Sequence, residues 1–276
     1  MVAQYEFRSK VLNILVIGSG NVERDIIELC LKSKLLNKIY TATSDPIEEF
    51  ANIEYSSFKE LAKKAKALQI DIALCFDINL IREGLVDVLR ENYVNVISVN
   101  KKWLNLETNR KVTHKLCEYY SLNIPKVIKA PVKFPIVVKT NIPKYKKIVF
   151  DMQELVSARE ELAGEEIFLE EFISGEELTV LFLWDGKNLI YFKTDRMLNE
   201  VQEFRLEYLK TRLAFMFYNE SPDFIGFFST KLIWTKNEWC ILEFIMRPDC
   251  TFSNNTIGKD LLYLLNAAIY QKLNEI

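Results

Sequence analysis

Short apolar runs alternate with segments of helical periodicity over residues 1–100, and this alternation constrains the fold more than any other feature of the chain. Each run is long enough for one strand, and each intervening segment is long enough for one helix. Strands that alternate with helices are joined by crossovers, which make neighbouring strands parallel. We therefore expect a parallel, doubly wound α/β domain over residues 1–100. Its expected strands are residues 12–17, 38–43, 70–76 and 94–98, and its expected helices are residues 21–34, 58–68 and 80–91.

A second feature is the stretch from Phe168 to Leu183, where carboxylates lie inside apolar runs. Because Ser174-Gly175 interrupts the apolar sequence, the stretch predicts two buried strands joined by a short polar turn. Burying Glu170 or Glu171 costs free energy unless a partner compensates the charge. A ligand with hydroxyl groups and an exocyclic amine is one such partner. The alternative is a plain β-hairpin whose acidic side chains face water.

Composition argues against several classes of protein. The 276 residues suffice for two modest domains, and the net charge of −2 argues against an extended nucleic-acid-binding surface. No apolar run is long enough to span a membrane, and the N-terminus lacks the apolar segment of a signal peptide. The five cysteines show no CxxC spacing, which predicts buried thiols in a reducing cytoplasm. His114 is the only histidine, which argues against a His-rich metal site and a Ser-His-Asp triad, and we expect it on the surface of a helix.

The stretch 168–183 resembles the adenine-binding hinge of the ATP-grasp enzymes. Its sequence motif, Glu-Glu-Phe-x-x-Gly-Glu-Glu, is most similar to that of the phosphoribosylamine–glycine ligases (glycinamide ribonucleotide synthetases). The resemblance implies that Glu170 and the backbone of Glu171 and Ile173 contact the adenine edge. It also implies that Glu177 accepts hydrogen bonds from the ribose hydroxyls, a role that suits a carboxylate.

The first strand leads into Ile-Gly-Ser-Gly-Asn-Val-Glu-Arg, which resembles the family's opening Ile-Gly-Ser-Gly-Gly-Arg-Glu-His. Gly18, Gly20 and Glu23 match, whereas Val22 replaces the family's arginine in a loop that helps to hold phosphoribosylamine. A nicotinamide dehydrogenase fits less well, because Glu23 stands at the position of the third glycine of G-x-G-x-x-G. The acidic residue nearest to the end of the second strand, Asp45, also lies two residues too far along the chain to hold a ribose. The remaining alternative is a tight strand-to-helix turn without a ligand.

Two basic residues match positions at which the family contacts nucleotide phosphates. Ser98-Val-Asn-Lys-x-x-x-x-Leu-Glu-x-x-Arg110 tracks the family's Gly-Pro-Thr-Lys…Leu-Glu-Gly-Ser-Lys, which puts Arg110 where the family has a lysine. Phe134-Pro-Ile-Val-Val-Lys139 resembles the strand whose lysine meets the α-phosphate side of ATP. The resemblance therefore implies that Arg110 and Lys139 bind phosphate. The alternative for Arg110 is a solvated residue at the start of a helix.

The family's glycine-rich flap, Gly-Leu-Ala-Ala-Gly-Lys-Gly, has lost every glycine here. The matching segment is Asn141-Ile-Pro-Lys-Tyr-Lys-Lys147, so Lys147 falls at the flap lysine. Pro143 also lacks a backbone N–H, so a phosphate cradle of backbone donors cannot form in the same way. Lys144, Lys146 and Lys147 still offer point charges to a phosphate. The alternative is a solvated basic turn.

Ile241-Leu-Glu-Phe-Ile-Met-Arg247 resembles the family's closing motif, Glu-Phe-Asn-x-Arg. In the family the Glu and the Asn coordinate magnesium, and the Arg meets the transferring phosphate. Glu243 and Arg247 match, which implies a magnesium ligand and a catalytic residue. Ile245 replaces the Asn and supplies no oxygen to a metal. The alternative for Arg247 is a salt bridge with Glu243.

The family's Gly-Pro-Asn-Thr-Gly-Gly-Met-Gly loop at the reacting centre is absent. Residues 199–219 instead predict one long helix, followed by paired strands at 224–234 and 238–245. Apolar side chains fall on two opposite faces of this helix, so we expect both faces to be covered.

The resemblance runs from Val11 to Ile276 in the family's order, although the family's separate C-terminal domain has no counterpart here. It implies an ATP-grasp domain over residues 101–276, made of two α+β subdomains at 101–168 and 169–276. It also implies ATP and Mg²⁺ as ligands, small-molecule substrates, and ligation of glycine to phosphoribosylamine through an acyl-phosphate in cytoplasmic purine biosynthesis. The changed loops and the lost metal ligand leave two alternatives: a ligase with another substrate, or a non-catalytic nucleotide-binding or scaffold protein.

Overall fold

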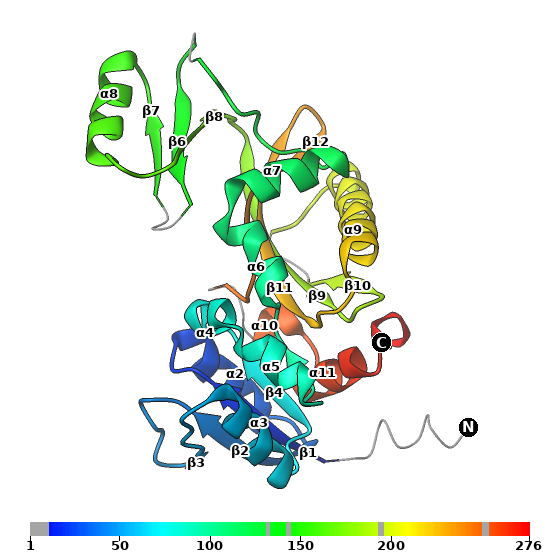
Figure 1. Ribbon diagram of the computed structural model, residues 1–276. Helices are drawn as coiled ribbons and strands as arrows, with labels where there is room; N and C mark the ends of the chain where they lie inside the picture. The colour runs from blue at the N-terminus through cyan, green and yellow to red at the C-terminus, as the bar shows by residue number, and fades with distance from the viewer. Residues whose placement is uncertain (1–10, 131–132, 142–144, 193–195, 250–253) are drawn as a thin grey trace.

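The computed structural model describes residues 11–130, 133–141, 145–192, 196–249 and 254–276, which form three β-sheets. The first is a five-stranded parallel sheet of order β3-β2-β1-β4-β5, at the bottom of the view in Figure 1. Its strands are β1 (Leu12–Ile17), β2 (Leu36–Ala42), β3 (Ala51–Asn52), β4 (Ile72–Cys75) and β5 (Val96–Ile97), and its helices are α2 (Asn21–Leu31), α3 (Phe58–Ala67), α4 (Ile78–Glu83) and α5 (Leu85–Glu91).

Helices cover both faces of the parallel sheet. Consecutive residues of β1 point to opposite faces, so Leu15 and Ile17 pack with α3 and α5 while Ile14 and Val16 pack with α2. The prediction of a parallel, doubly wound domain is therefore confirmed. The expected helix at 80–91 is two helices, because Gly84 adopts a left-handed φ of 94° that ends α4. The two-residue strand β3 was not predicted.

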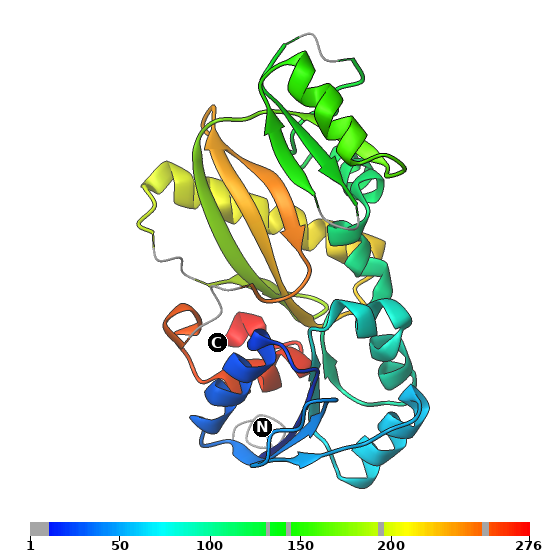
Figure 2. The same cartoon turned by 90° about the vertical axis from the view of Figure 1, so that its left-hand side faces the viewer.

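The rest of the chain builds two antiparallel sheets, with three strands in the order β7-β6-β8 and four in the order β10-β9-β11-β12. Figure 2 shows α8 on the three-stranded sheet and α9 along the far side of the four-stranded sheet. The strands are β6 (Ile136–Thr140), β7 (Lys146–Val149), β8 (Ile167–Glu171), β9 (Glu176–Trp184), β10 (Leu189–Tyr191), β11 (Gly226–Thr235) and β12 (Glu238–Ile245). The helices are α6 (Lys101–Thr108), α7 (Arg110–Tyr119), α8 (Met152–Glu161), α9 (Glu200–Glu220), α10 (Asn254–Ile257), α11 (Leu261–Ile269) and the 3₁₀ turn η1 (Leu273–Glu275).

The stretch 168–183 is a connection between sheets, not a β-hairpin. Strand β8 pairs with β6, whereas β9 pairs with β10 and β11. The chain therefore passes from one sheet to the other at residues 172–175. The subdomain boundary after residue 168 stays a prediction. A methyl group at Gly175 would lie 2.1 Å from the carbonyl oxygen of Trp234, so the close approach at this crossing requires glycine.

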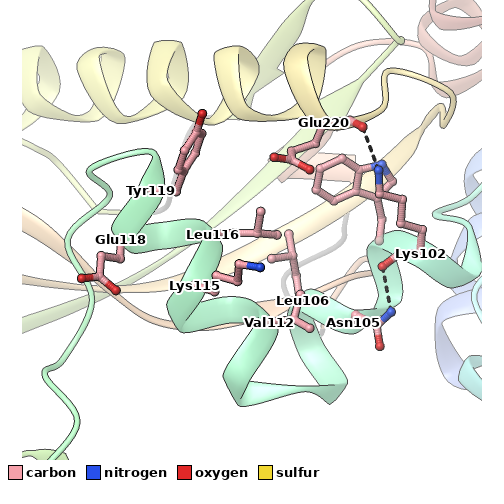
Figure 3. A pocket seen from close by; sticks show the side chains of 10 residues that line it. Lys102, Asn105, Leu106, Val112, Lys115, Leu116, Glu118, Tyr119 and Glu220 are labelled. Carbon is pink, nitrogen blue, oxygen red and sulfur yellow. Dashed lines mark hydrogen bonds between the residues drawn. The ribbon is translucent and has the colours of Figure 1, made fainter.

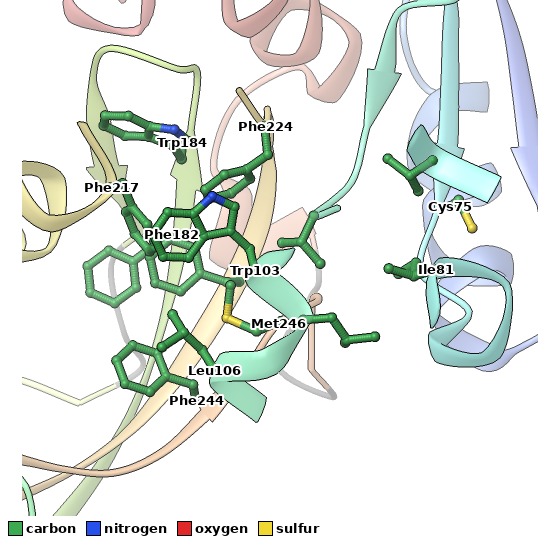
Figure 4. Close-up of a cluster of buried hydrophobic side chains, with 14 of the residues drawn as sticks. Cys75, Ile81, Trp103, Leu106, Phe182, Trp184, Phe217, Phe224, Phe244 and Met246 are labelled. Carbon is green, nitrogen blue, oxygen red and sulfur yellow. The ribbon is translucent and has the colours of Figure 1, made fainter. Parts of the chain in front are cut away.

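Helix α6 packs both on α4 and on β12 of the four-stranded sheet, and the start of the first subdomain at residue 101 stays a prediction. Figure 4 shows Trp103 and Leu106 of α6 among aromatic side chains of this sheet and of α9. The Trp103 and Phe217 rings meet edge to face, with centroids 4.8 Å apart. The indole Nε1 of Trp103 donates to the Ser221 carbonyl oxygen at 3.0 Å, so this buried polar group is satisfied.

The long helix predicted at 199–219 is α9, and the described residues cover only one of its faces. Leu206, Leu213 and Phe217 are fully buried against the sheet, while Phe204 and Phe215 on the other side are 68% and 56% exposed. The expectation that both faces are covered is therefore not met by the described residues. No helix within the described ranges is long and apolar enough to span a membrane.

Arg90 ties the parallel domain to the four-stranded sheet. Its guanidinium donates to the backbone oxygens of Ser98 at 2.9 Å and Asp223 at 2.8 Å, where Ser98 and Ile225 form an isolated antiparallel bridge. A methyl group at Gly226 would lie 2.8 Å from the Ser98 carbonyl carbon, so a side chain there would separate the two units. Residues of α11 complete the junction by packing with α2 in one hydrophobic core.

We expect Trp103→Ala to lower the free energy of unfolding by about 3–5 kcal/mol, because it removes a buried aromatic ring from this core. Urea unfolding followed by circular dichroism measures the loss. Tyr119→Ala is the matched control: its ring lies on the adjoining helix α7 and is 77% exposed, so we expect a change of less than about 1 kcal/mol. Equal losses in the two variants would contradict this account of the core.

Candidate functional site

A narrow cleft separates the three-stranded sheet from the face of the four-stranded sheet opposite α9, and lysines cross it. Lys139 Nζ of β6 donates to the Leu242 carbonyl oxygen of β12 at 3.1 Å. Lys146 Nζ of β7 lies 3.8 Å from Glu243 Oε1 of β12. The free volume here is only about 20 Å³, so charged side chains fill most of the space between the sheets.

Glu170 is the centre of this site. Its side chain is fully buried on β8, where it forms ion pairs with Arg110 and, at 2.9 Å, with Lys139 Nζ. His114 Nε2 lies 2.8 Å from Glu170 Oε1 and donates to it, because an ionised carboxylate only accepts. The expectation that His114 lies on the helix surface is therefore wrong: α7 turns it toward Glu170, one helical turn from Arg110, and its side chain is 17% exposed.

Three nitrogen groups outweigh the cost of burying this carboxylate. Burial alone would raise the pKa of Glu170, but the hydrogen bond from His114 and the charges of Arg110 and Lys139 lower it to about 2. Burial and the nearby Arg110 charge lower the pKa of Lys139, and the Glu170 charge opposes that shift. Glu170 is thus ionised at neutral pH.

Local structure explains why the phosphate-site candidates point inward. Arg110 is the first residue of α7, and Asn141 Oδ1 accepts a hydrogen bond from its backbone N–H at 2.8 Å. Arg110 is only 7% exposed, so the alternative of a solvated helix start is excluded. On β6, Ile136 and Val138 pack toward α8, so alternation turns Lys139 to the cleft.

The hinge residues lie at the rim of the cleft. The Glu171 carboxylate accepts a hydrogen bond from the Lys126 N–H at 3.0 Å, and Ile173 packs against Ile233 and Leu242. Glu177 is exposed on β9, where it lies opposite Ile233 in the ladder. The adenine and ribose roles of Glu170, Glu171, Ile173 and Glu177 stay predictions.

In the flap segment Lys146 points toward the cleft, whereas Lys147 is the residue that matches the family's flap lysine in sequence. Lys146 lies opposite Lys139 in the β6–β7 ladder and shares its face. Lys147 follows it, so alternation places Lys147 on the side of the sheet that carries α8. The role of Lys147 in nucleotide binding stays a prediction. Pro143 and Lys144 lie outside the described residues.

Arg247 pairs with a partner that the sequence did not reveal. Its Nη1 lies 2.7 Å from Glu107 Oε1 of α6, and Glu107 Oε2 also accepts the Met246 N–H at 2.8 Å. Arg247 therefore forms its salt bridge with Glu107, and not with Glu243 as in the alternative. Glu107 is the Glu of the Leu-Glu-x-x-Arg110 motif, and nothing local in that motif indicates that α6 reaches the end of β12.

The residues around Glu243 do not fit a magnesium site. Glu243 Oε1 faces Lys146, and Glu243 Oε2 lies 3.9 Å from Lys231 Nζ. Ile245, two residues along β12, offers no oxygen, although Mg²⁺ requires about six oxygen ligands in octahedral order. Within the described ranges no three His, Cys, Asp or Glu side chains gather into a metal-binding group. The role of Glu243 as a metal ligand therefore receives no support from its surroundings.

The glycine turn after β1 is filled by the protein itself. Glu23 is 5% exposed and folds back over the turn, where a methyl group at Gly20 would lie 2.6 Å from its Oε2. Burial and the Asp77 charge raise the pKa of Glu23, against hydrogen bonds from backbone N–H groups. The free volume beside Gly18 is about 10 Å³. Because the carboxylate occupies the helix N-terminus, this arrangement does not favour a dinucleotide pyrophosphate there.

A separate groove of about 570 Å³ lies between α6, α7 and the C-terminal end of α9 (Figure 3). Leu106, Val112 and Leu116 form its floor, with Lys102 and Glu220 at one end. It is larger than the cleft but brings together none of the buried ion pairs, so the cleft remains the candidate site.

Comparison with known proteins connects this geometry to a group of ligases. No protein-family model matches the sequence. The chain is 25% identical over 320 aligned positions to the phosphoribosylamine–glycine ligase of Brucella melitensis, covering 96% of this chain and 74% of that protein. The phosphoribosylamine–glycine ligase structure from Thermotoga maritima superposes with a TM-score of 0.67 at 16% identity, over 86% of this chain and 69% of that chain. A Bacillus anthracis D-alanine–D-alanine ligase complexed with ATP superposes with a TM-score of 0.65 at 18% identity, over 96% of this chain and all (100%) of that chain.

We expect Glu170→Gln to flatten the pH dependence of stability. The pKa of about 2 lies below the ordinary value of 4.5, so the ionised carboxylate stabilises the folded state above pH 4.5. This contribution, roughly 3 kcal/mol, is lost as the pH falls from 4.5 toward 2. At pH 7 the variant also leaves Arg110 and Lys139 without their carboxylate, which should lower the free energy of unfolding by about 3–5 kcal/mol.

Chemical unfolding between pH 7 and pH 3 measures both effects. Glu171→Gln is the control, because its half-buried side chain accepts only a backbone hydrogen bond among the contacts described, and it should keep the wild-type pH slope. An unchanged slope in Glu170→Gln would contradict the assignment.

Proposed function

We propose that this chain, which has the ATP-grasp fold and is similar in sequence to the phosphoribosylamine–glycine ligases, binds ATP between its two antiparallel sheets and couples ATP cleavage to carboxylate–amine ligation. The B. anthracis neighbour of similar fold is complexed with ATP. Small-molecule substrates and a place in cytoplasmic purine biosynthesis belong to the same proposal, by similarity to the named relatives.

The observation that carries the proposal is the group of basic side chains gathered in the cleft beside the hinge. Arg110, Lys139 and Lys146 line one small volume, and they come from α7, β6 and β7. Residues 172–175 connect β8 to β9 next to it. An adenine ring at this connection would place its polyphosphate toward the basic side chains, which bind phosphate by charge-assisted hydrogen bonds.

The reaction follows from the similarity to the named ligases. A carboxylate oxygen of glycine attacks the γ-phosphorus of ATP, the bond to ADP breaks, and an acyl-phosphate forms. The amine nitrogen of phosphoribosylamine then attacks the acyl carbon, phosphate leaves, and the nitrogen loses a proton as the amide forms. Arg247 is held by Glu107 at the end of β12, where its guanidinium would orient the transferring phosphate.

The second candidate is a non-catalytic nucleotide-binding or scaffold protein, or a ligase with another substrate. Two observations favour it. Lysines and an isoleucine surround Glu243, and Val22 stands where the relatives' loop has an arginine. This candidate keeps nucleotide binding but not the turnover of glycine and phosphoribosylamine.

We expect Lys139→Met to weaken ATP binding about tenfold or more, because one buried charge opposite the phosphates is lost. Adenosine has no phosphates, so its affinity should change little. Isothermal titration calorimetry with ATP and with adenosine measures both, and thermal melts confirm that the variant folds. Wild-type protein that binds neither ligand would contradict ATP binding.

Turnover separates the two candidates. With ATP, glycine and phosphoribosylamine, the ligase releases ADP, and Arg247→Ala should lower the rate by about 100-fold or more through loss of a phosphate contact. Arg247→Lys keeps the charge but not the planar geometry and should fall in between. ATP binding without ADP release from any of the three proteins would support the second candidate.

A further inference from the structure

Glu243 lies between two lysine ammonium groups, and this arrangement points to a polyphosphate site that works without a divalent metal. Its carboxylate is buried, at 6% exposure, on the face of β12 that borders the cleft. Lys146 Nζ lies 3.8 Å from one oxygen and Lys231 Nζ lies 3.9 Å from the other. Both oxygens that a metal would use therefore face positive charges, which repel a divalent cation.

Strand register fixes Lys231 in this position. In the antiparallel β11–β12 ladder, Lys231 is the direct partner of Glu243. A register shift follows between Lys231 and Leu232, where β12 carries the extra residue Leu242. Phe228 and Leu232 of β11 face the α9 core, so Lys231 lies on the opposite, cleft-facing side.

Lys146 reaches Glu243 from the other sheet. It lies on β7 beside Lys139, in the ladder that β6 and β7 form. Its ammonium group lies between the two sheets, where the side chain is 39% exposed. Lys146 therefore forms an ion pair with one carboxylate oxygen of Glu243, and Lys231 forms an ion pair with the other.

The charge balance of the cleft is positive without a metal. Among the ion-paired side chains between the sheets there are five cations, Arg110, Lys139, Lys146, Lys231 and Arg247, and three carboxylates, Glu107, Glu170 and Glu243. The carboxylates of Glu171 and Glu177 at the rim lie outside this set. A polyphosphate bound to Mg²⁺ carries two fewer negative charges than the free anion. A site with its own surplus of ammonium groups suits the free anion, since lysine binds phosphate as a point charge.

We propose that Lys146 and Lys231 take the place of a divalent cation beside Glu243, so that the cleft binds a metal-free nucleoside polyphosphate. This inference rests on the proposed function, because it assigns the charge state of the ATP that the cleft accepts. The two lysines neutralise Glu243 by charge and present N–H donors to the phosphate oxygens.

Calorimetry with ATP in EDTA and with ATP in excess MgCl₂ tests the inference. We expect wild-type affinities that differ by less than about threefold, and Lys231→Met should weaken binding in EDTA about tenfold or more. Lys187→Met is the control, because this lysine is exposed at the β9–β10 turn, and its ATP affinity should stay unchanged. Wild-type binding that tightens more than about tenfold with Mg²⁺ would overturn the inference but keep the proposed function. Absence of ATP binding in both buffers would overturn both.

A second measurement does not depend on the nucleotide. Mn²⁺ alone, followed by electron paramagnetic resonance, should not bind the wild-type protein at micromolar concentration. The double variant Lys231→Glu with Ile245→Asn restores oxygen donors beside Glu243 and should gain Mn²⁺ binding. Thermal melts verify folding in each case. Mn²⁺ binding by the wild-type protein that Glu243→Gln abolishes would overturn the inference.

Discussion

The buried carboxylate of Glu170 is the interaction on which the cleft depends. It lies on β8, at the end of the three-stranded sheet, and holds Arg110 from α7, Lys139 from β6 and His114 from α7. Removing such a carboxylate leaves uncompensated positive charges in a region of low dielectric. The same contacts position Arg110 and Lys139, the side chains proposed to meet a phosphate, so stability and the proposed binding depend on one set of residues.

The two antiparallel sheets meet through polar contacts of Lys139 and Lys146, whereas the four-stranded sheet packs against α6 and α9 through apolar side chains. Lys139 and Lys146 cross the cleft to β12, and little volume remains between the sheets. On its other side the same sheet packs α6 and α9 through aromatic rings. A polar interface of few contacts opens at lower cost than an apolar core. A nucleotide would therefore enter by separating the sheets about residues 172–175, replacing lysine–carboxylate contacts with lysine–phosphate contacts.

Several changes from the ligase pattern lie in or beside the cleft. The hinge keeps its acidic pair and its glycine, and Gly175 is required by the nearby Trp234 carbonyl. The flap glycines and one metal ligand are absent, and Lys231 stands opposite Glu243. At these positions the positive charge beside Glu243 comes from lysine side chains.

The sequence by itself determined the parallel domain, the order of the elements, and the resemblance to the ATP-grasp ligases, which the comparisons confirm. Apolar periodicity reports on local burial, so β1, α2 and α9 followed from residues close together in the chain. The tertiary structure alone decided which charges meet. His114 and Glu170 are 56 residues apart, and Arg247 and Glu107 are 140 apart. Lys231 faces Glu243 only because of a strand register that no local pattern specifies. Ion pairs depend on distances between side chains, and those distances are fixed only when sheets and helices pack together.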